Sequence, residues 1–140
     1  MLFRSWLVAL FLVMVRNEKL TAAALIGSGA LIWSTNIVAV AVAFWELDRG
    51  GPFARDPRHA RDEQPPDLLF PQMTGVPGWD PATWRPSFVD YLFVAFTTAT
   101  AFSPTDTMPM SGRAKLLMLV AASVSLATIA IVAARAVNIL

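Results

Sequence analysis

Two long runs without charged side chains dominate the hydrophobic pattern of the chain. The first extends from Leu20 to Trp45, 26 residues, and the second from Leu116 to Ala134, 19 residues. As helices they would be about 39 and about 28 Å long, enough to cross a hydrocarbon core of about 30 Å. A lysine and an arginine flank the second run, and their long stems can carry the charges out to the headgroups. The pattern predicts two transmembrane helices, over 20–45 and 114–140.

Two shorter apolar stretches cannot cross a membrane. Trp6 to Val15 is ten residues long and ends in a charged cluster, which predicts a partial N-terminal helix over 1–19. A cleaved signal peptide is the alternative, but the charged cluster precedes the small residues where cleavage would occur. We therefore interpret the chain as an N-terminally truncated fragment. Phe88 to Phe102, fifteen residues or about 22 Å, stops before Pro104, which predicts a re-entrant helix within 88–113.

The segment between these helices, 46–87, has the composition of a loop in water. It holds eight of the ten prolines and twelve of the 21 charged residues, and no periodic apolar pattern survives in it. Its patch from Arg55 to Glu63 contains the only histidine, His59, and we interpret it as a solvated charge run. A metal site would need further ligands at set spacing, so we expect neither a metal nor a cofactor. Trp79 and Trp84 suit an anchor at the membrane interface.

The overall composition is that of a protein dissolved in lipid. Of all residues, 56% are apolar and 15% charged, whereas a soluble domain carries about a quarter charged residues. We expect an all-α polytopic membrane protein with two full transmembrane helices, a short re-entrant pore-type helix and a partial N-terminal helix. The expected location is the inner (plasma) membrane, as a multi-pass protein. A net charge of +1 gives no basic field for nucleic acid, and the absence of cysteine excludes disulfides and thiolate chemistry.

The orientation follows in part from the basic residues. Arg16 and Lys19 predict that the first full span starts on the cytoplasmic side, which places the long loop outside. If the short helix re-enters, Arg113 and Lys115 also lie outside, which the positive-inside tendency disfavours. If the short segment crossed fully instead, those two residues would lie inside. Length favours re-entry, and the full crossing stays open as the alternative.

Hydroxyl side chains are dense where the short helix ends and the chain turns back. They are Thr97, Thr98, Thr100, Ser103, Thr105 and Thr107. Within a membrane, irregular backbone survives only if it is buried in protein or faces water, because lipid cannot satisfy free amide groups. We therefore expect this turn to line a cavity or a pore.

The stretch TAFSPTDTMP resembles the filter region of two-helix potassium channels, which reads TTVGYGD and is commonly followed by two residues and a proline. Thr100, Asp106 and Pro109 stand at the family spacing. The resemblance covers most of the chain in layout but less than half in residue pattern, and it extends to uncharacterised bacterial integral membrane proteins with this altered loop. It implies an outer helix, an extracellular loop, a pore helix, a filter strand and an inner helix. It also implies a homo-oligomer, a tetramer in the case of a channel for monovalent cations. The implied pore-lining or filter-like residues are Thr97, Thr98, Thr100, Ser103, Pro104, Thr105 and Asp106.

The departures from that filter bear directly on function. A potassium filter aims a row of backbone carbonyls at the ion, and its glycines supply the required backbone angles. Here Ser103 and Thr105 occupy the two glycine positions and Pro104 occupies the tyrosine position. Proline removes an amide donor and restricts the residue before it, so we expect no potassium-selective filter. An ion channel of altered or no selectivity is the first hypothesis, and a non-conducting scaffold or accessory subunit is the alternative.

Other residues have a structural and a functional interpretation. Asp106 would attract cations at the mouth of the filter or brace its turn, and the threonines would line a pathway or bond back to their own helix. Asn36 is expected to make an interhelical hydrogen bond. The small residues predict packing faces: Ser123, Ala127, Ala130 and Ala134 on one span, Ala23 and Gly27 on the other. Without a Ser/His/Asp set, paired membrane carboxylates or a metal motif, we expect no enzyme.

Overall fold

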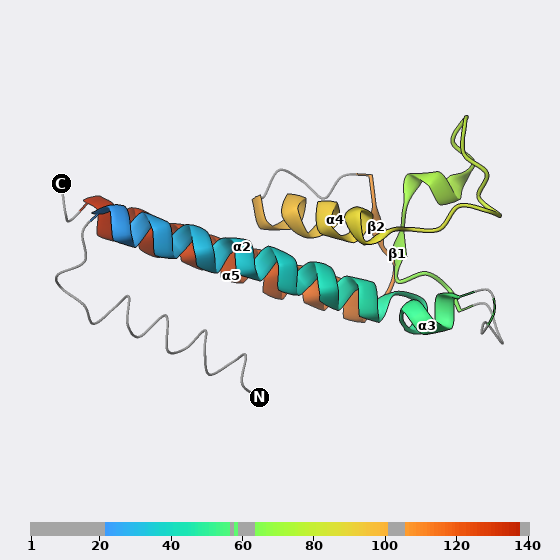
Figure 1. The fold of residues 1–140 in the computed structure, drawn as a ribbon, viewed down its shortest axis with the longest axis horizontal. Coiled ribbons are helices and arrows are strands. Elements are labelled where there is room, and N and C mark those ends of the chain that lie inside the picture. Colours follow the sequence, from blue (N-terminus) through green and yellow to red (C-terminus); the bar gives the residue numbers. More distant parts are fainter. Residues whose placement is uncertain (1–21, 57, 59–63, 101–105, 138–140) are drawn as a thin grey trace.

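Two long antiparallel helices form the frame of the protein. The computed structural model describes four parts of the chain, namely residues 22–56, 58, 64–100 and 106–137. The helices α2 (Ala22–Leu47) and α5 (Gly112–Val137) have 26 residues each and pack side by side (Figure 1). The sequence predicts spans over 20–45 and 114–140. Both ends of α2, and the start of α5, lie within two residues of these predicted bounds. The predicted partial helix over 1–19 lies outside the described residues.

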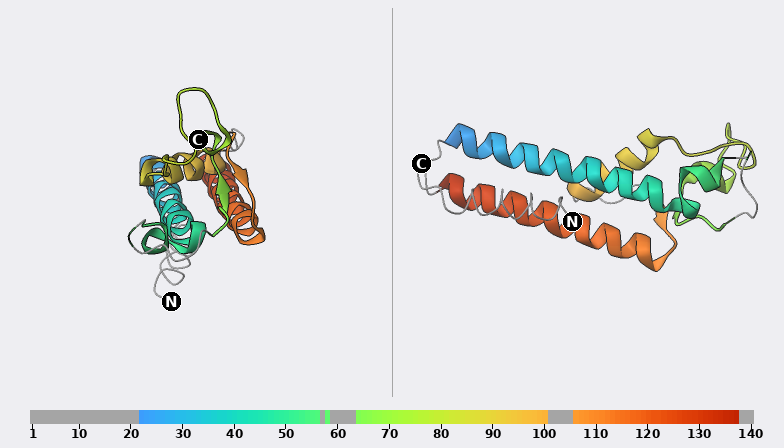
Figure 2. Two further views of the ribbon diagram at one scale, coloured as in Figure 1. Left: turned by 90° about the vertical axis from the view of Figure 1, so that its right-hand side faces the viewer. Right: turned by 60° about the horizontal axis from the view of Figure 1, so that its bottom comes forward.

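A third helix, α4 (Phe88–Thr100), covers one part of this hairpin. It has 13 residues and packs against both α2 and α5. Figures 1 and 2 show that α4 starts at the end of the hairpin where α2 stops and α5 begins, and that it points toward the opposite end. The chain is next described at Asp106 and Thr107, which line one pocket together with Asp90 of α4. The chain therefore returns to the end of the hairpin from which α4 departs.

Short elements gather at this same end of the hairpin (Figure 1). They are η1 (Asp48–Gly50), α3 (Pro52–Arg55), β1 (Leu68–Leu69), η2 (Pro71–Thr74) and β2 (Met108–Pro109). The strands β1 and β2 pair antiparallel, with Leu68 opposite Pro109. The segment 46–87, which the sequence assigns to an aqueous loop, thus contains packed elements. Its residues Leu68 and Phe70 belong to the buried core.

The turn that ends α2 depends on glycine. Arg49 and Gly50 both have positive φ, 50° and 79°, and Gly51 follows at 97°. A Cβ on Gly51 would lie 3.1 Å from the carbonyl oxygen of Glu46, in addition to the strain of that φ. This sharp reversal ends the helix and sends the chain into α3.

The core lies between the three helices and the short elements. Tyr91 and Val94 of α4, Phe44 of α2 and Leu68 of β1 are fully buried. The rings of Phe70 and Tyr91 meet edge to face, with centroids 5.5 Å apart. Such contacts fix α4 against α2 and β1, because aromatic side chains bury large apolar areas with a preferred mutual geometry.

Away from this core, the two long helices leave most of their apolar surface uncovered by the described chain. In the most apolar stretch of each helix, only 33% of α2 and 11% of α5 is buried. Leu31 is 70% exposed and Leu126 is 69% exposed. A core helix of a soluble protein would be largely covered. Both helices are long and apolar enough to cross a membrane, which indicates a membrane protein.

The contact between α2 and α5 uses different small residues from those predicted. The residues Ala23, Gly27, Ser123, Ala127, Ala130 and Ala134 are exposed, so the two predicted rows of small residues are not packing faces within the described chain. Gly29 makes the close approach instead, because a Cβ there would lie 2.5 Å from Cγ2 of Val132. The side-chain amide of Asn36 donates to the Ala121 carbonyl at 3.3 Å and to Ser125 Oγ at 2.9 Å. The predicted interhelical hydrogen bond of Asn36 is confirmed.

Candidate functional site

Helix α4 starts with a capping arrangement. Both the backbone amide and the hydroxyl of Ser87 donate to Oδ2 of Asp90, each at 2.7 Å. The amide of Asp90 in turn donates to the Ser87 carbonyl at 3.1 Å. A carboxylate in the first turn also complements the partial positive charge of the helix start. The cap fixes where the short helix begins.

The three threonines near the end of α4 bond to their own helix. Thr97 Oγ1 donates to the carbonyl of Phe93 at 3.0 Å, and Thr98 Oγ1 donates to that of Val94 at 2.8 Å. Thr100 Oγ1 does the same one turn back, at 3.0 Å from the Phe96 oxygen. Each hydroxyl keeps its acceptor lone pairs, so the oxygens remain able to face a cation.

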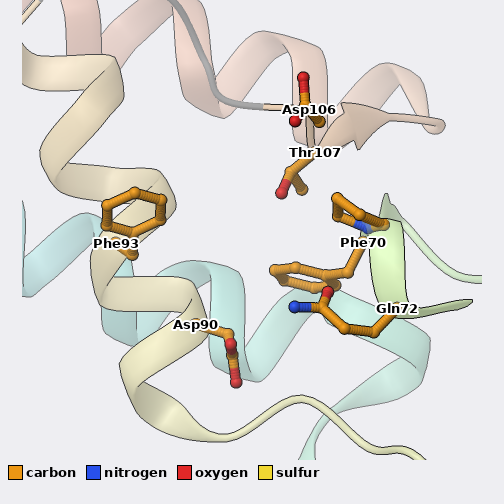
Figure 3. Close-up of a pocket in the computed structure, with 7 residues that line it drawn as sticks. Phe70, Gln72, Asp90, Phe93, Asp106 and Thr107 are labelled. Carbon is orange, nitrogen blue, oxygen red and sulfur yellow. The ribbon is translucent and has the colours of Figure 1, made fainter. Parts of the chain in front are cut away.

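The remaining predicted filter residues divide into two groups. Ser103, Pro104 and Thr105 lie outside the described residues. Asp106 is exposed, and its neighbour Thr107 is buried. Asp106 and Thr107 form one wall of a pocket of about 230 Å³, which Figure 3 shows between α4 and the start of η2.

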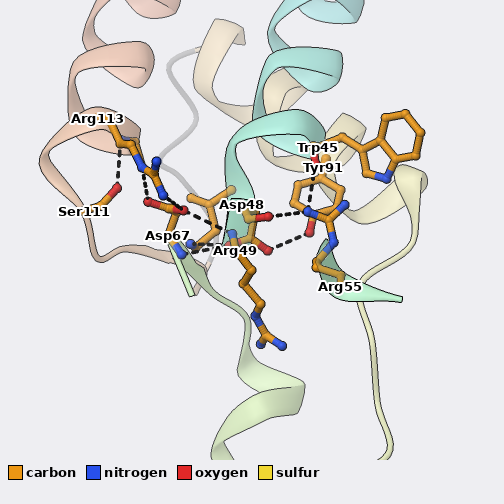
Figure 4. A network of polar contacts seen from close by, with 10 residues as sticks. Trp45, Asp48, Arg49, Arg55, Asp67, Tyr91, Ser111 and Arg113 are labelled. Atoms are coloured by element: carbon orange, nitrogen blue, oxygen red, sulfur yellow. Dashed lines mark hydrogen bonds and ion pairs between the residues drawn. The ribbon is translucent and has the colours of Figure 1, made fainter. Parts of the chain in front are cut away.

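Sequence reasoning missed a buried polar network next to this pocket (Figure 4). At its centre is Asp48, directly after α2, whose side chain is fully buried. Its Oδ2 accepts a hydrogen bond of 2.7 Å from the Tyr91 hydroxyl, and its Oδ1 accepts from the amides of Asp67 at 2.8 Å and Leu68 at 3.3 Å. Burial raises the pKa of Tyr91, so its hydroxyl stays protonated as a donor. Asp48 therefore ties the end of α2 to β1 and α4.

A second buried carboxylate joins α5 to the same network. Asp67 is 2% exposed and accepts two bonds from Arg113, from Nε at 2.8 Å and from the terminal nitrogen at 2.7 Å. Burial by itself raises the pKa of Asp67, but the bonds from Arg113 and Ser111 outweigh it and hold that pKa below its ordinary value. The Arg49 amide adds a bond of 3.2 Å. The first turn of α5 is thus held against the chain next to β1.

The interpretation of the patch from Arg55 to Glu63 as a solvated charge run is wrong for Arg55. The sequence places it in a solvated charge run, whereas its guanidinium donates to the carbonyls of Trp45, at 2.8 Å, and of Asp48. A cation on the last carbonyls of a helix satisfies orphan acceptors and complements the partial negative charge there. The guanidinium also lies over the Tyr91 ring, 5.3 Å from its centroid. His59 and residues 60–63 of that run lie outside the described residues.

Together these contacts form what we call the polar clamp: Asp48, Arg55, Asp67, Tyr91 and Arg113. Its members come from η1, from α3, from the residue before β1, from α4 and from α5. The clamp therefore fixes both the start of α4 and the start of α5. Tyr91 lies 43 residues from Asp48 in the sequence, and Arg113 lies 46 residues from Asp67. Because these separations are so long, periodicity and spacing in the sequence gave no signal for the pairs.

The described residues contain no group of three or more histidine, cysteine, aspartate or glutamate side chains that could hold a metal ion. The clamp carboxylates are instead satisfied by a hydroxyl, backbone amides and a guanidinium. Both oxygens of each carboxylate accept at least one such bond, so the two carboxylates link separate segments of the chain.

Comparison with known proteins gives no assignment. No protein-family model matches the chain. Searches of curated proteins and of solved structures likewise return no significant match.

Proposed function

We propose that the protein is a multi-pass protein of the plasma membrane in which segment 88–113 is a re-entrant pore loop. The supporting observation is the path of this segment. Helix α4 is about 20 Å long, shorter than a hydrocarbon core of about 30 Å, and the chain is back at the starting end of the hairpin by Asp106. A segment that spanned the membrane would instead continue to the other end.

The proposed activity is passage of monovalent cations through a symmetric assembly of four chains. Helix α4 points its C-terminal end toward the middle of the hairpin, and the partial negative charge of a helix end favours a nearby cation. The oxygens of Thr97, Thr98 and Thr100 lie at that end. One chain supplies one wall of a pathway, so conduction requires several copies.

Exposed side chains of α4 support assembly. Val89 is 69% exposed, Phe93 55% and Phe96 45%. On a helix that lies beside the hairpin rather than in its centre, such residues are available to neighbouring copies. We expect little selectivity for potassium, because Ser103, Pro104 and Thr105 replace the residues of a potassium filter.

A labelling experiment tests the path of the segment. The chain has no cysteine, so single-cysteine variants need no background removal. We expect Gly78→Cys and Lys115→Cys to react with the same membrane-impermeant maleimide from the same side of intact membrane vesicles. Labelling of the two positions from opposite sides would refute re-entry, and with it the proposed function.

A flux assay tests conduction separately. Purified protein in liposomes should pass potassium and sodium, and Asp106→Asn should reduce the flux roughly two- to tenfold at low salt, with a smaller effect at high salt. Asp80→Asn, an exposed aspartate on the loop away from that pocket, is the matched control and should leave the flux unchanged. Liposomes that stay sealed under every gradient, with re-entry intact, would favour the non-conducting scaffold.

A further inference from the structure

A buried hydroxyl without a hydrogen-bond partner among the described residues faces the pocket between α4 and the start of η2. It belongs to Thr107, which is 5% exposed and makes no hydrogen bond with the described part of the chain. Figure 3 shows the Thr107 side chain directed into the pocket that it lines. Its oxygen is not fully enclosed, so a molecule in the pocket can reach it. A buried polar group without a partner is costly, so the site gains from a ligand that hydrogen-bonds to this hydroxyl.

Two carboxylates line the same pocket on different sides (Figure 3). Asp90 uses Oδ2 in the cap with Ser87, and Asp106 makes no hydrogen bond or ion pair with the described residues. No lysine or arginine is among the described residues that line the pocket. The two negative charges outweigh the partial charge of about +0.5 at the start of α4, so the pocket attracts a cation.

The size and the uncharged walls indicate an organic cation. The volume of about 230 Å³ is below that of drug-sized sites, about 300 to 1,000 Å³, and well above the space of about 30 Å³ that one water occupies. Phe70 and Phe93 supply aromatic surface, which attracts a positive charge and offers no oxygen ligand to a metal ion. The described residues also contain no group of three side chains that could hold a metal.

The positions of the acceptors select the shape of this cation. Asp90 and Asp106 lie on different walls, and the Thr107 hydroxyl is a third acceptor. An ammonium group carries its three N–H donors at one end, so it serves acceptors on one side of the pocket. A guanidinium group is planar, spreads five N–H donors around its edge, and stacks its face on aromatic rings. Separated acceptors and aromatic walls together therefore favour a guanidinium.

We propose that this pocket binds the guanidinium group of a small soluble compound. The edge of the group donates to the Asp106 carboxylate, to the Thr107 hydroxyl and to Oδ1 of Asp90. Its face lies against Phe70 and Phe93. The pocket is complete within one chain, so the proposal depends neither on conduction nor on assembly.

The test uses the full chain in phosphatidylcholine nanodiscs. Saturation-transfer NMR of methylguanidinium is expected to show saturable binding above that of empty nanodiscs. Methylammonium carries the same charge and the same methyl group, and it should bind about tenfold more weakly, a difference of 1.4 kcal/mol. Absence of saturable methylguanidinium binding would overturn the proposal, and so would methylammonium binding of equal strength. Liposomes that stay sealed in the flux assay would leave this result unaffected.

Variants of Thr107 test the group on which the site depends. Thr107→Val replaces the hydroxyl by a methyl group of similar size and should weaken methylguanidinium binding about fivefold. Thr107→Ser keeps the hydroxyl and should bind as the parent protein does. A serine variant that loses as much affinity as the valine variant would refute the assigned hydrogen bond.

The carboxylate of Asp106 is tested with a matched control. Asp106→Asn should weaken methylguanidinium binding about tenfold. Asp80→Asn, an exposed aspartate outside the pocket, should bind as the parent does. Asp106 is exposed and bonded to no described side chain, so its variant should keep the parent melting temperature. Unchanged binding in both Asp106→Asn and Thr107→Val would contradict the proposed site.

Discussion

The hydrogen bond between Tyr91 and Asp48 offers the sharpest test of the polar clamp. Both side chains are fully buried, and the hydroxyl lies 2.7 Å from Oδ2. Replacing Tyr91 with phenylalanine removes one oxygen and keeps the ring, so the edge-to-face contact with Phe70 and the ring beneath Arg55 are preserved. The change therefore isolates the hydrogen bond.

The expected cost follows from the partner that is left behind. A hydrogen bond to a charged group contributes about 1.5–3 kcal/mol, and here its loss leaves a buried carboxylate oxygen without its donor. We expect Tyr91→Phe to lower the free energy of unfolding by about 2 kcal/mol, roughly a thirtyfold change in the ratio of folded to unfolded protein. The amides of Asp67 and Leu68 still bind Oδ1, so the loss stays below that of deleting Asp48.

The assay is equilibrium unfolding in mixed micelles, followed by tryptophan fluorescence. Thr83→Val is the control, because it removes an exposed hydroxyl and should change stability by less than about 0.5 kcal/mol. A cycle that combines Tyr91→Phe with Asp48→Asn should show a coupling energy of at least about 0.5 kcal/mol. A Tyr91→Phe protein as stable as the parent would refute the view that the clamp holds α4.

Two further predictions concern the ion pair and the helix contact. The pKa of Asp67 is lower in the folded protein than in the unfolded chain, so its contribution to stability is present above the ordinary value of 3.8 and is lost as the pH falls through the folded value. Between pH 6 and pH 3, the melting temperature of the parent protein should therefore fall at the acidic end. In Arg113→Gln the melting temperature should fall less steeply with pH. An equally steep fall in the two proteins would contradict this account. Gly29→Ala should destabilise the protein by about 1–2 kcal/mol relative to Gly27→Ala, because the new methyl group meets Val132 only at position 29. Equal melting temperatures of the two variants would show that the helices do not approach closely there.

The clamp also answers a difficulty raised by the sequence. Re-entry places Arg113 on the outside, against the positive-inside tendency. The structure gives this arginine a partner in Asp67, a buried carboxylate at the same end of the hairpin. A paired arginine is held by its local bond, so it carries less information about membrane orientation than an arginine in a simple loop.

The sequence by itself determined the helices. Their positions follow from runs of apolar residues and from where charges and prolines interrupt those runs, which are local properties of the chain. The starts of α2, α4 and α5 therefore lie within two residues of the predicted starts. The hydrogen bond of Asn36 could also be predicted, because a polar side chain within an apolar span needs a partner on another helix.

The tertiary structure alone decided which side chains meet. Asp48, Asp67 and Tyr91 lie far apart in the chain, and water could satisfy each side chain on its own. Only the packing of their segments against one another makes them a buried network. The close approach at Gly29 rather than Gly27 likewise depends on how the two helices rotate against each other. Rotation and long-range pairing are set by the packing of all three helices together, and no local pattern in the sequence encodes them.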